Sequence, residues 1–518
     1  MKNSFDQTIH QILSPKEARC ISELNQIPVI TVPVKMSEKI KKAQRKRKLK
    51  EKLDLRDKSR MGDKSVVIIS SQNNKLNHYK GQSYGRFQDV PLISQGWGNR
   101  KSVGKHFTIN SHGGNLAFTL KTDLKPTKTM KNSPLSLKFL SLKNKVHIIN
   151  SSTIKALAIP EVLNGSNTLI SAETGNGKTL AFLAPMLQQI SARKNNIHDM
   201  KPNTPLGLII APGRELAQQI SSVAEVLSAE LGIKTRLIQG GRTKQLVLNP
   251  TVEETHLVIA TLGALSKLTT SQVYDMSLVQ HITLDEADSL FDDSFNEKIM
   301  HYLGKIPIRG SSQELPGTVE MSGAQLTLVS ATTPRSLDTI LEPILETESL
   351  IKITTPYLHR LMPHVPQRFI RVSHTNKATK LLEIAKKSTS NKTPIIIFSN
   401  TSKSSDWVSL FLNENNVSCI NLHGDMSAVL REGRFDAFQS GKVMALSCTD
   451  LTSRGLDTVK AGHVINFDFP KYMADYIHRC GRTGRVGSTR TGLVTSFIHR
   501  NFEVELVQKI EVSYTCIF

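Results

Sequence analysis

The stretch SAETGNGKTL, residues 171–180, constrains the fold more than any other part of the chain. An apolar run before it predicts a short buried strand, and the apolar residues after it predict a helix. Between them, Gly175 and Gly177 permit a tight turn whose backbone N–H groups point toward an anion. A strand, a glycine turn and a helix in this order are typical of a phosphate-binding loop, although Ala172 replaces its usual first glycine.

Two residues of this loop carry the chemistry expected of it. Lys178 would reach the outer phosphates of a nucleotide, and the hydroxyl of Thr179 would ligate Mg²⁺. The expected ATP-binding positions of the loop are Ala172, Glu173, Thr174, Gly175, Asn176, Gly177, Lys178 and Thr179.

An acidic cluster in the sequence LDEAD, residues 284–288, follows the apolar run HITL. A carboxylate at the end of a strand beside a phosphate loop is where a Mg²⁺ ligand is needed, because the ion must bridge phosphate oxygens. Asp285 fits that role, and Glu286 is placed to hold or deprotonate the attacking water. We therefore expect Thr179 and Asp285 to hold Mg²⁺ in a site that hydrolyses a nucleotide.

The chain is strongly basic, with 67 lysines and arginines against 44 acids and a formal net charge of +23. Beside a phosphate loop, this excess favours nucleic acid as the partner over an acidic protein or a membrane surface. A generally basic proteome or organelle is the alternative explanation.

Residues 39–60 hold twelve lysines and arginines against three acids, which predicts a solvated helix or a disordered arm. Such an arm either attracts phosphate backbones regardless of sequence, or serves as a solubilising tail or a nuclear import signal. Further along, Trp97 lies in the basic stretch SQGWGNRKSVGKHF. It could stack on a base, although anchoring a flap onto the folded core is the commoner use of such a tryptophan.

The five cysteines are scattered, without a C-x-x-C pair or a histidine at zinc spacing. This pattern predicts a reducing compartment and no structural metal. No apolar run approaches the length of about 18 residues needed for a membrane helix, so no membrane span is expected. The first residues, MKNSFDQTIH, show neither a secretory signal nor an evident mitochondrial presequence.

From about residue 135, short apolar runs alternate with helical patterns, which is typical of parallel α/β sheets. Runs such as LGLIIAP and HITLD end in small or polar residues, as buried parallel strands do when they deliver groups to the carboxyl edge. A second series of such runs follows residue 355. We expect a basic, largely irregular and partly disordered N-terminal extension, two α/β domains and a linker between them. The expected ranges are 1–130 for the extension, 135–350 and 367–515 for the domains, and 351–366 for the linker.

The ordered set of motifs resembles that of the DEAD-box RNA helicases of superfamily 2, over roughly residues 135–515. Beyond AETGNGKT and DEAD, the first half holds PGRELA, a GG pair and SAT, and the second half holds IIIFSNT, LHGDM, TDLTSRGLD and HRCGRTGR. This resemblance implies two tandem RecA-like domains with parallel sheets and an RNA-dependent ATPase that uses ATP and Mg²⁺. It also implies that the domains close on ATP and RNA, because residues of both serve hydrolysis.

The resemblance assigns roles to matching positions in the second half. His478 matches an ATP-binding position, and Asp457 resembles the residue that holds the ATP ribose. Arg482 and Arg485 match the arginine fingers that neutralise the transition state, and their spacing predicts one helical face for both. The expected catalytic set is Lys178, Asp285, Glu286, Arg482 and Arg485.

The resemblance also implies RNA contacts and a coupling element. The family contacts the sugar-phosphate backbone, which positions RNA without reading its sequence. The matching RNA-binding positions are Pro212, Arg214, Gly241, Thr261 and Thr449. SAT resembles the element that couples the ATP site to RNA, and the matching coupling residues are Asp288, Ser330 and Thr332.

Three motifs depart from the family pattern. Upstream of the phosphate loop, the family has a glutamine that reads adenine, and this chain has Lys155 in the sequence SSTIK. A lysine donates to adenine N7 or N1 but lacks the paired donor and acceptor of an amide, so selectivity for ATP is open. TLGAL in place of TPGRL, and Gly213 in place of the threonine of PTRELA, predict a weaker or differently made RNA contact.

The segments PLISQGW, TLGAL and MPHVPQ resemble a narrower group, the animal mitochondrial DEAD-box helicases of large ribosomal subunit assembly. This narrower resemblance implies ribosomal RNA as substrate, preribosomal proteins as partners and the mitochondrial matrix as location. The nucleus or nucleolus is the alternative location.

The expected function is that of an ATP-dependent RNA helicase that unwinds short duplexes or remodels ribonucleoprotein. A non-catalytic or weakly catalytic RNA clamp is the alternative, which Lys155 keeps open and the intact catalytic set argues against. A DNA helicase is a third interpretation, because only the resemblance chooses RNA over DNA.

Overall fold

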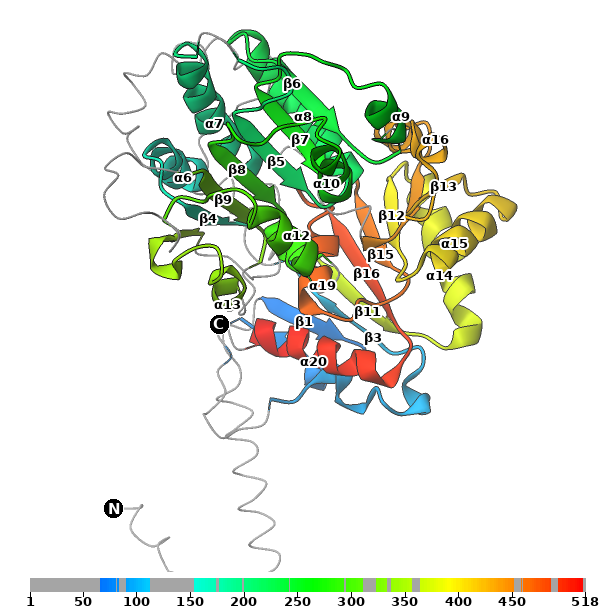
Figure 1. The fold of residues 1–518 in the computed structure, drawn as a ribbon. Helices are drawn as coiled ribbons and strands as arrows, with labels where there is room; N and C mark the ends of the chain where they lie inside the picture. Colours follow the sequence, from blue (N-terminus) through cyan, green and yellow to red (C-terminus); the bar gives the residue numbers. More distant parts are fainter. Residues whose placement is uncertain are drawn as a thin grey trace, which may run out of the picture. The chain divides into compact units, whose positions relative to one another are not determined.

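The computed structural model describes residues 66–80, 82, 90–111, 153–173, 177–197, 200–241, 243–292, 295–310, 323–332, 337–355, 364–450, 458, 460–485 and 492–515. The chain divides into two compact units. The larger comprises Ile68–Asn77 and Pro91–Val512, and the smaller comprises Met1–Val67, His78–Val90 and Ser513–Phe518. Strand β2 (His78–Tyr79) belongs to the smaller unit, and the larger contains two mainly parallel sheets (Figure 1).

The first sheet has seven strands whose pairings are all parallel. Across the sheet they are β10 (Ile351–Thr354), β4 (Thr168–Ser171), β9 (Gln325–Ser330), β8 (His281–Asp285), β5 (Gly207–Ala211), β7 (Leu257–Thr261) and β6 (Thr235–Ile238). Residues 351–354 had been expected in the linker and form the edge strand β10, paired with β4.

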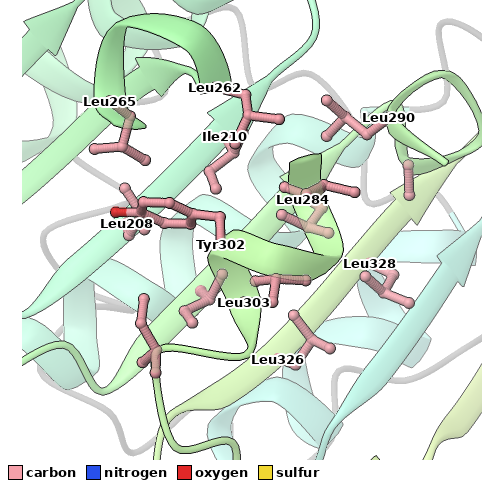
Figure 2. Packing of buried hydrophobic residues seen from close by; sticks show 14 of the residues in the cluster. Leu208, Ile210, Leu262, Leu265, Leu284, Leu290, Tyr302, Leu303, Leu326 and Leu328 are labelled. Atoms are coloured by element: carbon pink, nitrogen blue, oxygen red, sulfur yellow. The ribbon is translucent and has the colours of Figure 1, made fainter. Parts of the chain in front are cut away.

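Both faces of the first sheet are buried. Successive side chains of each strand point to opposite faces and so enter two different hydrophobic clusters. Leu208 and Ile210 of β5 pack in one hydrophobic cluster, and Ile209 packs in the other. Figure 2 shows the first cluster, with Leu265 of one helix and Leu303 of another lying over the strands. The described helices of this half are α6 (Thr153–Leu163), α7 (Lys178–Lys194), α8 (Arg214–Ala229), α9 (Thr243–Leu248), α10 (Leu262–Thr270), α11 (Ala287–Leu290), α12 (Asn296–Leu303) and α13 (Leu337–Leu341).

The second sheet contains a parallel core and two antiparallel strands at one side. Its parallel strands, in order, are β13 (Cys419–Leu422), β14 (Ala445–Cys448), β12 (Ile395–Phe398), β15 (His463–Asn466), β16 (Leu493–Ile498) and β11 (Gln367–Arg371). The described helices of this half are α14 (His374–Ser390), α15 (Ser402–Glu414), α16 (Ala428–Arg431), α17 (Arg434–Gln439), α19 (Met473–Cys480) and α20 (Asn501–Thr515). Short 3-10 helices complete the described elements: η1 (Asn74–Leu76), η2 (Ile93–Gly96), η3 (Arg100–Ser102) and η5 (Thr347–Ser349).

The two antiparallel strands come from the N-terminal extension, where the sequence pattern had predicted none. Strand β3 (His106–Ile109) pairs with β11, and β1 (Val67–Ser71) pairs with β3. Trp97 is fully buried, and its ring lies 5.3 Å from that of Phe107, which stacks on Phe369 of β11 at 4.8 Å. Trp97 therefore anchors this segment to the second sheet and is not exposed for stacking on a base.

A buried carboxylate also fastens the N-terminal segment to helix α20. Glu511 accepts hydrogen bonds from the backbone N–H groups of Ile93 and Ser94, at 2.6 and 3.2 Å, and from the Ser94 hydroxyl at 2.7 Å. Burial raises the pKa of Glu511, and these hydrogen bonds oppose that shift.

Two further features of the described residues bear on the expectations. Cys419, Cys448 and Cys480 are buried, and among the described residues they form no disulfide. In the part of the chain that the structure describes, the helices are too short or too polar to cross a membrane.

Candidate nucleotide and RNA site

The expected phosphate-binding loop lies where the sequence placed it, between a buried strand and a helix. Strand β4 ends at Ser171, and α7 begins at Lys178. Gly177 precedes the helix with φ of +78°, a left-handed conformation that glycine adopts without strain. The first backbone N–H groups of α7 therefore follow directly on the glycine turn, as anion binding requires. Residues 174–176, which include Thr174, Gly175 and Asn176, lie outside the described residues.

Lys178 is held by the loop that it serves. Its ammonium donates to the backbone carbonyls of Ala172 at 2.5 Å and Glu173 at 3.1 Å. Burial lowers the pKa of Lys178, and the nearby carboxylates of Asp285, Asp288, Glu286 and Glu173 oppose that shift. The cation thus lies among acids, within reach of the loop where phosphates would bind.

Two adjacent acids lie at the end of β8, a strand that β9 separates from β4. Burial, helped by the charge of Glu286 and opposed by that of Lys178, raises the pKa of Asp285 to about 7. Glu286 has φ of +50°, which is rare for a residue with a side chain and marks a conformation that the surrounding structure imposes. Its backbone N–H donates to the Asp285 carboxylate at 2.9 Å.

The acids fit a site for a divalent ion and a water molecule. The buried Oε2 of Glu286 has no hydrogen-bond partner among the described residues, so it can accept one from a water molecule. A buried Asp285 whose pKa is raised would be stabilised as a carboxylate by a nearby cation. Within the described residues, no group of three or more histidine, cysteine or acidic side chains could hold a metal. An ion held by Thr179 and Asp285 would therefore take its other ligands from phosphates and water.

The SAT residues are bonded to the last acid of DEAD. Asp288 Oδ2 accepts from the backbone N–H of Thr332 at 3.1 Å and from its hydroxyl at 2.6 Å. The Ser330 hydroxyl donates to the carbonyl of Thr332 in turn. Burial alone would raise the pKa of Asp288, but the charge of His478 and hydrogen bonds from His478, Thr332 and Ser330 hold it well below its usual range.

Residues of the second half meet these acids. His478 Nε2 lies 3.0 Å from Asp288 Oδ2, and Arg482 Nη2 lies 3.8 Å from Glu286 Oε1. The Arg482 guanidinium is almost fully buried and also donates to the carbonyl of His478 at 3.1 Å. The coupling residue Asp288 is therefore in contact with His478, and the catalytic residue Glu286 is paired with the expected arginine finger Arg482.

The prediction that both arginine fingers lie on one helical face is wrong. Helix α19 ends at Cys480 with Gly481 as its C-cap, and Arg482 and Arg485 lie beyond the helix. The Arg485 Nε donates to the Gly481 carbonyl at 2.9 Å, so the two side chains are positioned by loop geometry and not by helical spacing.

The expected RNA-binding residues of the first half lie along the same sheet edge as the nucleotide residues. Pro212 follows β5, Thr261 ends β7, and Gly241 follows β6 with φ of +107°. These three strands are neighbours, whereas β4, β9 and β8 carry the nucleotide and coupling residues. Because parallel strands bring their carboxyl ends to one edge, the expected nucleotide residues occupy one half of this edge and the expected RNA residues the other, and we name these the nucleotide half and the RNA half.

Arg214 opens α8 in the RNA half of the edge. Its guanidinium packs on the GG pair, so that a Cβ at Gly240 would lie 3.0 Å from Arg214 Nη2. Its buried Nη1 has no hydrogen-bond partner among the described residues. Burial lowers the pKa of Arg214, as does the neighbouring cation Arg431. A buried donor of this kind suits a phosphate oxygen.

Two buried arginines were missed by sequence reasoning. Arg431 of α16 donates through Nε to Glu215 at 2.9 Å, and this pair joins the second half to the PGRELA motif. Arg479 donates to both carboxylate oxygens of Asp450 at 2.6 Å, which ties HRCGRTGR to TDLTSRGLD. Glu215, Asp450 and Arg479 lie within recognised motifs, which is the one signal that could have pointed to them, and Arg431 lies outside the motifs.

The remaining expected residues are placed as follows. Thr449 follows β14, at the carboxyl edge of the second sheet. Asp457 lies outside the described residues. Lys155 is in the first turn of α6, with its side chain against Gly177.

Two family models match this chain. The model for DEAD/DEAH box helicases matches residues 152–340, and the model for the helicase conserved C-terminal domain matches residues 376–487.

The chain is similar in sequence to proteins named as ATP-dependent RNA helicases. The probable ATP-dependent RNA helicase DDX28 of Mus musculus is 37% identical over 459 residues, covering 86% of this chain and 84% of that protein. The protein of the same name from Homo sapiens is 32% identical over 521 residues, covering 98% and 94%. DEAD-box ATP-dependent RNA helicase 39 of Arabidopsis thaliana is 30% identical over 398 residues, covering 76% and 62%.

Solved structures share the fold. S. cerevisiae Dbp5 bound to RNA and ADP BeF3 is 23% identical with a TM-score of 0.59, covering 75% of this chain and 92% of that one. Mss116p bound to ssRNA and AMP-PNP is 23% identical with a TM-score of 0.62, covering 73% and 77%. At this identity the likeness establishes the fold, which is that of two RecA-like domains.

Proposed function

Because this chain belongs to the DEAD-box family of ATP-dependent RNA helicases, we propose that it couples RNA-dependent ATP hydrolysis to opening short duplexes or remodelling ribonucleoprotein. One observation carries this proposal. A single sheet edge presents a nucleotide half and an RNA half, and the Asp288–Thr332 hydrogen bonds lie in its nucleotide half, within contact of His478.

The nucleotide half supplies groups for phosphoryl transfer to water. Lys178 and the first N–H groups of α7 hold the outer phosphates. Mg²⁺ held by Thr179 and Asp285 would neutralise charge on the phosphate oxygens. Glu286 orients a water molecule through its unpartnered Oε2 and takes up the proton that this water releases.

Hydrolysis exchanges one bond of the γ-phosphorus for another. The water oxygen forms a bond to the γ-phosphorus while the bond from that phosphorus to the β–γ bridging oxygen breaks. ADP leaves with the electron pair, and the proton passes through Glu286 to solvent. Arg482 and Arg485 stabilise the negative charge that develops on the γ-phosphoryl oxygens.

The RNA half grips the backbone and not the bases. Arg214 offers a buried guanidinium donor next to the GG pair, and Thr261 and Thr449 offer groups at the ends of strands. Backbone contacts of this kind do not depend on the RNA sequence. The site itself would therefore bind RNA in general, and the selection of a particular RNA would depend on other parts of the chain or on partners.

ATP hydrolysis by the purified chain tests the proposal. We expect turnover that single-stranded RNA stimulates and a matched DNA strand stimulates far less, with Glu286→Gln abolishing turnover while ATP still binds. Equal stimulation by DNA would favour a DNA helicase. RNA binding without turnover in the wild type would favour the RNA clamp, and in either case the proposal would be rejected.

The biological process is a finer proposal. We place the protein in ribosome assembly in the mitochondrial matrix, acting on ribosomal RNA together with preribosomal proteins, on the basis of the segments PLISQGW, TLGAL and MPHVPQ. Crosslinking of the tagged protein to RNA in cells, combined with fractionation, tests this. Ribosomal RNA of the large mitochondrial subunit is the expected crosslinked species, and a nucleolar location with nuclear precursor RNA would contradict the proposal.

A further inference from the structure

The side chain of Lys155 lies along the phosphate loop. Lys155 is in the first turn of α6, and its Cδ, Cε and Nζ atoms lie 3.8, 3.3 and 3.6 Å from the position that a Cβ on Gly177 would occupy. Gly177 immediately precedes Lys178 and the N-terminus of α7. The ammonium of a second lysine is therefore at the turn around which nucleotide phosphates bind.

Two positive groups follow Gly177 directly in the chain. The N-terminus of α7 carries a partial positive charge from its free N–H groups, and Lys178 adds a full one. Lys155 is partly buried, and burial lowers its pKa. An anion bound at the Gly177 turn would stabilise the charged form of Lys155.

The chemistry of lysine also argues against adenine recognition by this residue. An ammonium has three donors and no acceptor. The edge of adenine that carries N7 presents one acceptor and the N6 amino donor, whereas guanine presents two acceptors there, N7 and O6. Lys155 cannot accept the adenine amino hydrogen, so it cannot favour adenine over guanine as an amide does.

We propose that Lys155 binds the phosphate chain of the nucleotide at the Gly177 turn, so that the site accepts GTP as well as ATP. The inference rests on the proposed function of this site as a nucleoside triphosphatase. At the position where the family has a glutamine that reads adenine, this chain would have a second lysine that binds phosphate.

Equilibrium binding to the full chain, without RNA and without turnover, tests this. The probes are ATP, GTP and inorganic tripolyphosphate, which has phosphates and no base, each with Mg²⁺. For the wild type we expect ATP and GTP affinities within about tenfold of each other, a difference of at most about 1.4 kcal/mol. We also expect tripolyphosphate to compete with both nucleotides.

Three variants separate the contributions. Lys155→Gln and Lys155→Met should each weaken tripolyphosphate binding about tenfold, and Lys155→Gln should also raise the preference for ATP over GTP about tenfold. Lys155→Arg keeps the charge and should retain tripolyphosphate binding. Lys298→Gln makes the same change in net charge at an exposed position of α12 and should alter none of these affinities. Helix α12 packs on the opposite face of the sheet from α6.

Binding affinities test the role of Lys155, and RNA-stimulated hydrolysis tests the proposed function separately. Unchanged tripolyphosphate affinity in Lys155→Gln and Lys155→Met would mean that the lysine only packs on Gly177, and the inference would fall. A wild type that binds ATP more than a hundredfold tighter than GTP would also overturn it. The expected affinities in a protein without RNA-stimulated hydrolysis would support the inference and defeat the proposed function.

Discussion

A single carboxylate oxygen of Asp288 accepts both the backbone N–H and the hydroxyl of Thr332, at 3.1 and 2.6 Å. The same Oδ2 lies 3.0 Å from His478 Nε2. Asp288 is therefore the atom-level junction between DEAD, SAT and HRCGRTGR. A movement of SAT or of HRCGRTGR away from DEAD breaks a hydrogen bond to this carboxylate.

Removing the Thr332 hydroxyl tests this junction. Thr332→Val keeps the shape of the side chain and deletes the hydrogen bond to a buried carboxylate, which is worth about 1.5–3 kcal/mol. We expect a lower midpoint in thermal unfolding and a loss of most RNA stimulation of ATP hydrolysis. Thr332→Ser retains the hydroxyl and should preserve both properties. Full RNA stimulation in Thr332→Val would show that the hydroxyl plays no part in coupling.

The two arginines beyond α19 are expected to act on the transition state. Arg482→Ala and Arg485→Ala should each lower kcat by about 10³ to 10⁵, the range typical of arginine fingers. ATP affinity should change little, because the charge they stabilise develops only in the transition state. Steady-state hydrolysis and equilibrium binding measure the two quantities. Arg500→Ala, an exposed arginine of the same half, is the control, and full turnover in Arg485→Ala would remove that residue from the assignment.

A buried histidine should make the second sheet sensitive to acid. His463 of β15 lies between Ser388 and Thr495, and burial lowers its pKa from 6.5 to about 4. The unfolded chain therefore binds a proton between pH 6.5 and 4 that the folded chain does not, so stability falls as pH falls through this window. The loss should be about 2 kcal/mol at pH 5 and about 3 kcal/mol at pH 4.

Denaturant unfolding at several pH values measures this effect. His463→Gln carries no titrating group, so its free energy of unfolding should fall less steeply than that of the wild type between pH 6.5 and 4. Parallel curves for the two proteins would show that His463 titrates alike in the folded and unfolded states.

Glu511 should hold the N-terminal segment in place. In Glu511→Gln one oxygen becomes an amide N–H₂ group facing backbone donors of Ile93 and Ser94, which costs about 1–3 kcal/mol. We expect faster cleavage within residues 91–111 in limited proteolysis. Glu505→Gln, on the exposed side of the same helix, should leave the rate unchanged. Equal cleavage in both variants would indicate that packing of Trp97 suffices for docking.

The basic stretch at residues 39–60 should contribute salt-dependent affinity for RNA. Each phosphate that it neutralises adds about 0.7 to the slope of log affinity against log salt for a single strand. Deleting residues 1–65 should flatten that slope while leaving RNA-stimulated turnover at low salt in place. A slope that does not change would leave the arm a role in solubility or nuclear import.

Local patterns predicted the parts of the site that depend on short stretches of chain. The glycine turn before Lys178 and the acids after HITL lie at strand ends because a buried strand followed by polar residues is a local signal. The helical face proposed for Arg482 and Arg485 failed because Gly481 ends α19 first. The functional roles of these residues, and the ribose contact of Asp457, stay predictions.

Long-range pairings could not be predicted in the same way. The Arg431–Glu215 pair joins residues 216 positions apart, and no local pattern marks either side chain as a partner. Strands β1 and β3 are short and lie in a basic, glycine-containing region, so the pairing of β3 with β11 and of β1 with β3 shows only in the folded structure.

The pairing of β3 with β11 has a consequence for synthesis of the chain. Ile109 and its partner Gln367 are separated by 258 positions (367 minus 109), and the whole first sheet is encoded between them. At about 5–20 residues per second, the ribosome makes the partner strand roughly 10–50 s after β3 has emerged. During that interval β3, Phe107 and Trp97 have no native surface to cover them, and an uncovered strand edge is a site of mispairing. The nascent N-terminal segment is thus where we expect a chaperone to be needed first.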